Sequence, residues 1–398
     1  DILDEIISGR KNMSEILGYP SYASYTIENA MAKDPVAVWE FENSLRKSIE
    51  KKASLDVQEM LEMKRDHSGA SEVILYDWDK YYYENQILRN QYNVDSKEVK
   101  EYFELNRVIE GIFLITGSIF GIQYREVQNP SVWHPEVRMY EVRDSMSGSL
   151  LGVFYLDLFP RKNKYQHAAE FTIFSGKKIG DDYQLPVACL VCNFPRENPK
   201  FPSLLSHDDV ETLFHEFGHL VHDILSKTEL SNQAGTSVAM DFVEAPSQML
   251  ENWVWSSEAL KLFARHYQTD EIIPDTLLKS MVDARNLQSG NDLLQQIFYG
   301  ILDLTLHENF EPEGAQSTTD LVILLQNTIT HYPHFTGTNQ LASFDHLLDY
   351  SASYYGYLWS EAYAADMFSV FEENGIFDVE SGMRFRKIIL EKGGSENP

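Results

Sequence analysis

The sequence is poor in cysteine and in basic residues, and it has no long apolar run. Two cysteines among 398 residues exclude a fold held together by several disulfides, and their scarcity fits a reducing compartment. Lysine and arginine number 33 against 61 acidic residues, which gives a formal charge of −28. Such a charge repels phosphate backbones and anionic lipid heads, so we expect no nucleic-acid or membrane partner. No apolar run approaches the roughly 18 residues that span a bilayer, and we expect a cytoplasmic protein, with an organellar matrix as the alternative.

The composition itself is that of an ordinary globular protein, 43% apolar and 13% aromatic, which is sufficient for more than one hydrophobic core. Apolar side chains recur at three-to-four spacing in residues 1–120 and again from Ser206 onward, which predicts helices. Residues 121–195 instead hold four β-rich runs, at 139–142, 150–156, 169–174 and 187–194. We predict a mainly α-helical fold with one small β-sheet. The expected division is an N-terminal helical part at 1–120 and a second part at 121–398, joined in one continuous unit.

The motif that carries chemistry is His-Glu-Phe-Gly-His at residues 215–219. His215 and His219 are four residues apart, so on a helix both imidazoles lie on one face and can bind one zinc ion. Glu216 lies beside them, where it can take a proton from the water that the metal activates. Ser206 and Asp209 form a capping-box pattern at the start of this helix. The alternative is a solvated helix with two unrelated histidines.

A third ligand is needed, because catalytic zinc sites use three protein ligands and keep one open position. In the metzincin pattern H-E-x-x-H-x-x-G-x-x-H the third ligand is a histidine, which would be residue 225 here. Residue 225 is Leu, so this pattern does not apply. His222 would lie about 10.5 Å along the helix from His215, too far for a shared ion, so we interpret it as a surface or supporting histidine. Glu244 begins an apolar-periodic helix, and a metal would account for a carboxylate in that setting. The alternative is an ordinary first-turn glutamate that complements the helix dipole.

These residues carry a resemblance to a known family. Residues 215–219, followed by 241–253, strongly resemble the thimet oligopeptidase family of zinc metallopeptidases. That family includes oligopeptidase A, peptidyl-dipeptidase and mitochondrial intermediate peptidase. Further similar stretches lie at 157–161, 164–169, 202–212 and 354–359.

The resemblance implies His215, His219 and Glu244 as ligands of one zinc ion per chain, and Glu216 as the general base. It also implies an almost wholly helical, two-lobed catalytic unit. A deep channel between the lobes would admit only short unstructured peptides. The small sheet would line that channel, where an edge strand could pair with the substrate backbone. Residues 121–398 would then be the catalytic region.

The resemblance further points to His346, Tyr354 and Tyr357. A phenol hydroxyl near zinc can donate to the oxyanion that forms when water attacks a peptide carbonyl, and one such donor contributes roughly 3–4 kcal/mol. Tyr354 and Tyr357 are three apart and share a face if the segment is helical. The alternative is that they belong to an aromatic core stripe with Tyr350, Tyr355 and Trp359.

Two acidic residues, Glu211 and Asp241, are expected to support the ligands without binding the metal. The sequence departs from the family pattern at three places. Residues 346–350 lack the glycines found in many relatives, and Met240 replaces an arginine that would pair with Glu211. The family also has longer helical regions on both sides, so we expect the chain to be part of a longer enzyme.

These observations predict a monomeric zinc-dependent oligopeptidase that cleaves short peptides. A peptidyl-dipeptidase of the same family is the alternative enzyme, because the chemistry is identical and only the end of the channel would differ. A non-catalytic zinc protein that binds peptides is the alternative outside enzymes. The intact Glu216 speaks against it, since a pure binder needs no base beside the metal.

Overall fold

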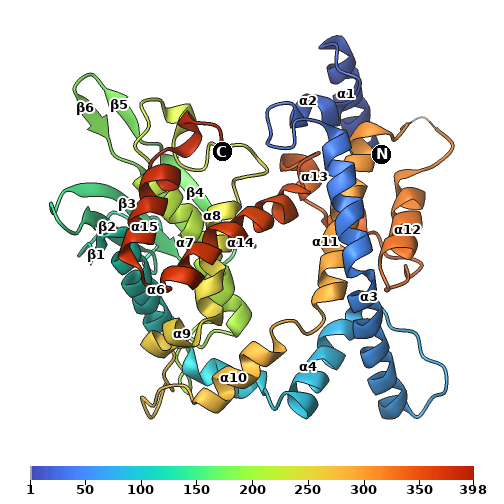
Figure 1. Cartoon of the computed structure of the whole chain (residues 1–398), viewed down its shortest axis with the longest axis horizontal. Helices are drawn as coiled ribbons and strands as arrows, with labels where there is room; N and C mark the ends of the chain where they lie inside the picture. Colours follow the sequence, from blue (N-terminus) through green and yellow to red (C-terminus); the bar gives the residue numbers. More distant parts are fainter. Residues whose placement is uncertain (1, 313) are drawn as a thin grey trace. The chain divides into compact units, whose positions relative to one another are not determined.

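The computed structural model describes residues 2–312 and 314–398, and it shows a mainly helical chain with one five-stranded sheet (Figure 1). The predicted fold class is therefore confirmed. The chain forms two compact units, each built from two segments. Unit 1 is the chain up to Asn93 together with Asp283–Trp359, and unit 2 is Val94–Val282 together with Ser360–Pro398.

This division differs from the predicted one between residues 120 and 121. Helix α6 (Leu105–Phe120) packs against strand β1 and helices α9 and α15 of unit 2, so it separates from the N-terminal helices. Helix α11 (Ser289–Glu308), from the middle of the chain, packs along α3 (Pro35–Ser68) in unit 1. The predicted channel between two lobes stays a prediction.

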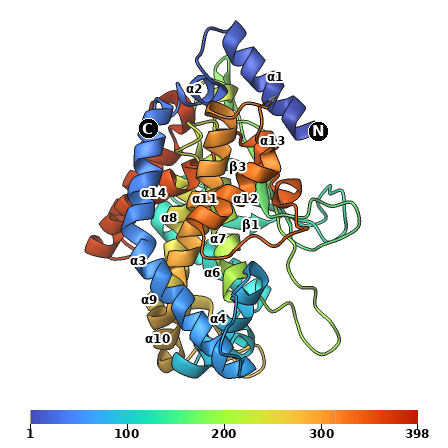
Figure 2. The ribbon, with the colours of Figure 1, turned by 90° about the vertical axis from the view of Figure 1, so that its right-hand side faces the viewer.

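Unit 1 is built around α3 and α11, which lie side by side (Figure 2). Helix α3 begins where the Asp34 carboxylate accepts the amide of Ala37, and it ends at Gly69 with a φ of 67°. The core side chains between the helices are fully or almost fully buried, among them Ala53, Leu294, Phe298, Leu302 and Leu306. Around them lie α1 (Ile2–Ile16), α2 (Tyr22–Ile27), α4 (Lys80–Gln91), α12 (Thr318–Ile329) and α13 (His346–Asp349).

Unit 2 contains the sheet, with strand order β1-β2-β3-β7-β4. The strands are β1 (Ile122–Glu126), β2 (Arg138–Asp144), β3 (Leu150–Asp157), β4 (Ala169–Phe174) and β7 (Val187–Val191). Strands β3 and β7 pair in parallel, and the other neighbours are antiparallel. All four predicted strands are confirmed, whereas β1 and the small hairpin of β5 (Lys177–Ile179) and β6 (Asp182–Gln184) were not predicted.

Helix α7 (His207–Leu225) covers this sheet and contacts β3, β4 and β7. It also packs on α8 (Ala245–Glu251). Unit 2 further contains α5 (Ser96–Val99), α9 (Ser257–Phe263) and α15 (Val379–Phe385). Helices α10 (Asp275–Ala284) and α14 (Gly356–Asn374) each run from one unit into the other. Among the described residues, no helix combines the length and the apolar character needed to cross a membrane.

Candidate metal centre and active site

The local sequence explains why α7 forms and how it is oriented. The hydroxyl of Ser206 accepts the amide of Asp209 at 3.1 Å, and the Asp209 carboxylate accepts the amide of Ser206 at 2.8 Å. This is the predicted capping box, and it satisfies two amides that the helix leaves unpaired. The apolar face is buried against the sheet and α8 through Leu213, Phe214, Phe217, Leu220, Val221 and Ile224. The opposite face carries His215 and His219.

Helix α8 approaches α7 closely at Gly218. A β-carbon at that position would lie 2.4 Å from Ser247 Cα and 3.0 Å from the carbonyl oxygen of Pro246. Only a glycine permits this distance. Because Glu244 immediately precedes α8, the close contact brings its carboxylate to the two histidines.

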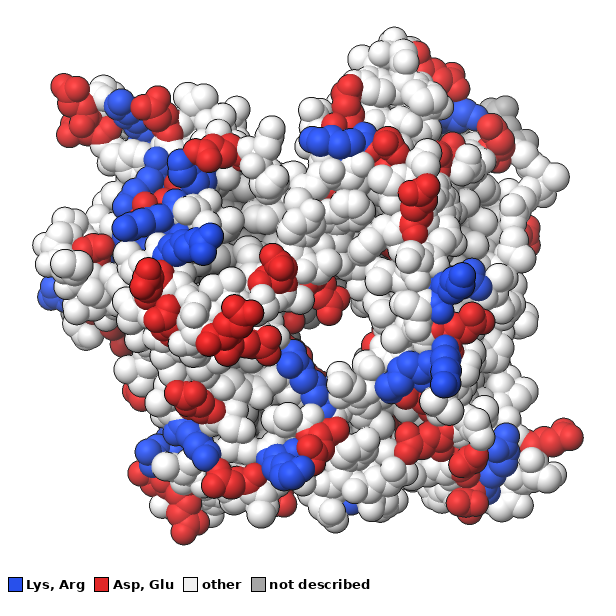
Figure 3. All heavy atoms as spheres, in the orientation of Figure 1, with Lys and Arg blue, Asp and Glu red and all other residues white. Residues whose placement is uncertain are grey.

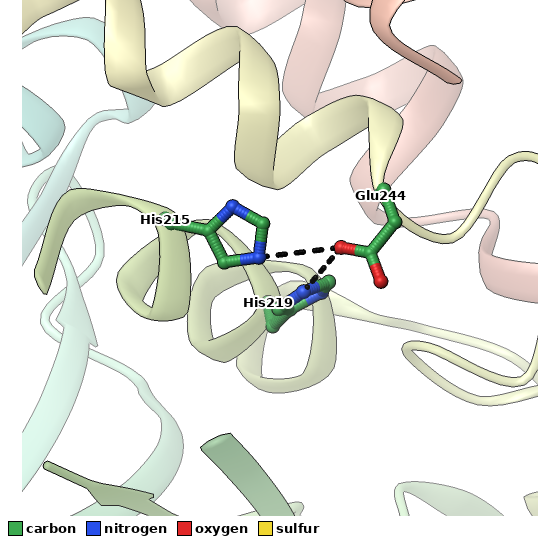
Figure 4. A group of neighbouring side chains, drawn as sticks. All are labelled: His215, His219 and Glu244. Carbon is green, nitrogen blue, oxygen red and sulfur yellow. Dashed lines mark ion pairs between the residues drawn. The ribbon is translucent and has the colours of Figure 1, made fainter. Parts of the chain in front are cut away.

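The three predicted ligands converge on one point (Figure 4). The Glu244 Oε2 atom lies 2.9 Å from His219 Nε2 and 3.3 Å from His215 Nε2, and the three ligand atoms lie within 4.8 Å of one another. Atoms about 2 Å from a tetrahedral zinc ion are roughly 3.3 Å from each other. The donor set of two imidazoles and one carboxylate, and its spacing, therefore fit a catalytic zinc ion.

Electrostatics keep the Glu244 carboxylate charged. Burial alone would raise its pKa, but His219 and His215 outweigh burial and hold the pKa of Glu244 well below its usual range. Burial likewise opposes the charge of His215, but its hydrogen bonds to Glu244 and Glu251 raise the pKa of His215 well above the usual value. The site thus concentrates negative charge around two imidazoles, as a divalent cation requires.

Sequence reasoning missed Glu251 as a site residue. Its Oε1 atom lies 2.6 Å from His215 Nδ1. When Nδ1 donates its proton to Glu251, the Nε2 lone pair is available to a metal ion, which is how carboxylates orient metal-binding histidines. Glu251 follows Glu244 by seven residues, two helical turns along the same face, and that spacing was the available signal.

Glu216 lies next to the ligands and is only 7% exposed. Burial raises its pKa, although His215 and His219 act in the opposite direction. The main-chain amide of Glu170, on β4, donates a hydrogen bond to this carboxylate. Since β4 is an edge strand, its open edge passes beside Glu216.

Glu211, Asp241 and His222 were predicted to lie near the ligands without binding the metal. Glu211 accepts the indole N–H of Trp255 at 2.8 Å. The pKa of the neighbouring Glu251 is raised, mainly by burial and in addition by the negative charge of Glu211. Asp241 is 1% exposed, and its carbonyl accepts the hydroxyl of Ser360 at 2.8 Å. His222 is also 1% exposed, so the interpretation as a surface histidine is wrong. Burial lowers the pKa of His222 to about 3 and keeps it neutral.

In unit 1, the structure brings His346, Tyr354 and Tyr357 together. His346 Nε2 lies 3.1 Å from the Tyr357 hydroxyl, and the His346 ring lies 5.0 Å from that of Tyr354. Tyr354 is 7% exposed, and its hydroxyl donates to Gln296 at 2.9 Å. Of the residues in the alternative aromatic stripe, Tyr350 stacks on Tyr357 with ring centroids 5.4 Å apart, whereas Tyr355 and Trp359 pack in a different hydrophobic cluster.

The chain is similar in sequence to known peptidases. The sequence is 36% identical over 400 residues to mitochondrial intermediate peptidase of Arabidopsis thaliana, and 35% identical over 401 residues to oligopeptidase A of Escherichia coli. It is 37% identical over 407 residues to thimet-like oligopeptidase of Dictyostelium discoideum. These matches cover 99–100% of this chain but only 56–60% of the relatives, so the chain spans a little over half their length.

A solved structure described as PZ peptidase A with inhibitor 2 matches with a TM-score of 0.55 at 13% identity. The match covers 99% of this chain and 59% of that one, and at such low identity it shows the fold alone. The model of peptidase family M3 matches residues 1–398. The chain therefore belongs to peptidase family M3.

Proposed function

We propose that this chain is the zinc-binding catalytic region of an oligopeptidase that hydrolyses short unstructured peptides. The observation that carries the proposal is the convergence of His215 Nε2, His219 Nε2 and Glu244 Oε2, with Glu216 next in sequence on the same helix. A zinc ion held by these three side chains would polarise a peptide carbonyl and lower the pKa of a bound water.

The residues of the chain have distinct roles in this proposal. Glu216 takes the proton of the attacking water and passes it to the leaving amine, a role favoured by burial that raises its pKa. Glu251 holds His215 in orientation. Tyr357, with His346 beside its hydroxyl, is the proposed donor to the oxyanion.

The edge strand β4 is the proposed docking edge for an extended peptide. Its outer side chains Phe171, Ile173 and Phe174 are 41–59% exposed, although they are apolar. An added strand would form main-chain hydrogen bonds with β4 and place its backbone beside Glu216. Acidic side chains are spread over the face shown in Figure 3, and a net charge of −28 favours cationic peptides through long-range attraction.

The test is turnover of an internally quenched short peptide before and after chelation and return of zinc. Glu216→Gln is expected to keep one zinc per chain and to lose at least about a hundredfold in kcat, because a positioned base contributes 10²–10⁴-fold. Glu258→Gln, at an exposed site on α9, is the matched control and should keep full activity. Normal turnover of Glu216→Gln would refute the mechanism.

The two alternatives from the sequence give different outcomes. A peptidyl-dipeptidase would release dipeptides from a free C-terminus and would fail on the same peptide with an amidated end. A non-catalytic binder would hold zinc and bind the peptide without turnover. The monomeric state remains a prediction, tested by light scattering of the purified chain.

A further inference from the structure

A buried carboxylate holds the segment that carries Tyr354 and leads to Tyr357. Asp303, on α11, is 1% exposed. One of its oxygens accepts the amide of Ala352 at 2.8 Å, and the other accepts the amides of Ser353 and Tyr354, each at 3.0 Å. Hydrogen bonds to a carboxylate are stronger than those between neutral groups, so three successive amides that share this acceptor are held firmly.

The backbone of this segment needs such an acceptor. Ala352 has a φ of 58°, in the left-handed region that residues with a β-carbon rarely adopt. This conformation helps to turn three amides toward the same carboxylate. The acceptor on α11 therefore stabilises a strained turn immediately before α14, whose first residues include Tyr357.

The polar contacts continue from Asp303 to His307, one turn further along α11. His307 Nδ1 lies 2.8 Å from the main-chain carbonyl oxygen of Asp303 and 2.9 Å from Asp303 Oδ1, and its Nε2 lies 2.9 Å from Arg10 Nη1. Since a guanidinium group only donates, Nε2 must accept, and Nδ1 must carry the proton that points to Asp303. Arg10 thus fixes the tautomer of a histidine that is 4% exposed.

Arg10 also reaches the helix that begins with His346. It donates to the carbonyl of Leu347 at 2.6 Å and to that of Leu348 at 2.9 Å, both in α13. The chain of Arg10, His307 and Asp303 therefore holds α13 at one end and the turn at 352–354 at the other. His346 directly precedes the first of these anchor points and Tyr357 follows the second, and His346 Nε2 lies 3.1 Å from the Tyr357 hydroxyl.

We propose that Arg10, His307 and Asp303 are positioning residues, and that they act on peptide hydrolysis by holding His346 and Tyr357 in register. None of the three needs to touch the substrate. This inference rests on the proposed function, because it takes Tyr357 as the donor to the oxyanion. The structural part, that Asp303 holds the turn and thereby the hydrogen bond between His346 and Tyr357, can be tested without activity.

The first experiment is hydrogen exchange of the whole chain with Asp303→Asn. The amide side chain keeps the shape but replaces one acceptor oxygen with a donor group. We expect the amides of 352–354 to exchange at least tenfold faster, and the imidazole ¹⁵N signals of His346 to shift as its bond to Tyr357 loosens. Asp292→Asn is the matched control on the same helix, because its half-exposed carboxylate pairs with Lys80. Unchanged exchange and unchanged His346 signals in Asp303→Asn would overturn the proposal.

The second experiment is a kinetic double-mutant cycle with Tyr357→Phe. Asp303→Asn alone should lower kcat about tenfold or more, with a smaller change in KM and with zinc content unchanged. In the Tyr357→Phe background, the same substitution should lower kcat less than about threefold, because its effect has already been lost. Equal losses in both backgrounds would overturn the positioning role.

A buried substitution can impair folding, so Arg10→Gln, at a half-buried site on α1, is the second variant. It should shift the same His346 signals and show the same non-additivity with Tyr357→Phe, to a smaller extent. Failure of the proposed function has a different signature, since turnover would then be absent from the parent chain or indifferent to Glu216→Gln. The exchange and imidazole signals would still decide whether Asp303 holds the turn.

Discussion

The close contact of α7 with α8 makes Gly218→Ala a sharp test of how the metal centre is built. The added methyl group would lie 2.4 Å from Ser247 Cα, whereas carbon atoms prefer about 3.5–4.0 Å. The obstructing atoms belong to the backbone, so the two helices must separate by roughly 1 Å. Overpacking of this kind costs about 1–3 kcal/mol, and the better helix propensity of alanine offsets about 1 kcal/mol of it. We expect a net loss of about 0–2 kcal/mol in the free energy of unfolding.

The effect on zinc should exceed the effect on stability. Glu244 directly precedes α8, and its Oε2 atom lies 2.9 Å from His219 Nε2. Metal–ligand distances tolerate only about ±0.2 Å, so a shift of α8 should lower zinc affinity at least about tenfold. Chelator competition measures the affinity, and urea denaturation measures the stability.

Gly9→Ala is the matched control for this substitution. A β-carbon on Gly9, inside α1, would meet no atom within 4 Å. The control should therefore gain up to about 1 kcal/mol from helix propensity and leave zinc affinity unchanged. If Gly218→Ala were as stable as the control and bound zinc equally well, the argument from close packing would be refuted.

Two further predictions concern carboxyl groups around α7. Glu251→Gln should lower zinc affinity about 10–100-fold without loss of the three ligands, because His215 loses its charged orienting partner, and chelator competition would show it. Asp223 is 1% exposed, and burial raises its pKa from 3.8 to about 7. Between these values the unfolded state ionises and the folded state does not, so stability should fall by up to roughly 4 kcal/mol as pH rises from about 4 to 7. Asp223→Asn should reduce this dependence without abolishing it, because the pKa values of Glu170, Glu216 and Glu251 are raised as well. An unchanged slope between pH 5 and pH 8 in urea denaturation would show that the reasoning is wrong.

The parts of the fold that follow from local chemistry could be predicted from the sequence. The cap at Ser206, the helical period after it and the strands at β2, β3, β4 and β7 are all encoded within a few residues. Strand β1 escaped prediction because Ile122–Glu126 directly follows α6 and is too short to show its own period. Its β structure depends on antiparallel pairing with the next strand, β2, which the residues of β1 alone do not reveal.

The division into units could not be predicted, because it depends on contacts that are distant in sequence. Helix α3 precedes the unit 2 segment Val94–Val282 in the sequence and α11 follows it, yet the two helices share one core. Gly290 shows how specific this packing is, since a β-carbon there would lie 2.4 Å from the amide nitrogen of Ala53. No composition shift near residues 93 or 283 marks such a boundary.

The candidate site was predictable to the extent that spacing fixes geometry. Four residues on a helix place His215 and His219 together, but residue chemistry alone left Glu244 open, because its approach depends on Gly218 and α8. The different surroundings of Tyr354 and Tyr357 also depend on contacts with residues that are distant in sequence. Tyr354 is buried and donates its hydroxyl to Gln296, whereas Tyr357 is half-buried and lies against His346. A donor to a developing oxyanion must be able to leave its ground-state partner, and an imidazole nitrogen is a partner that can either donate or accept a proton. The proposed function takes Tyr357 as the donor on the basis of these hydrogen bonds, rather than of the three-residue spacing.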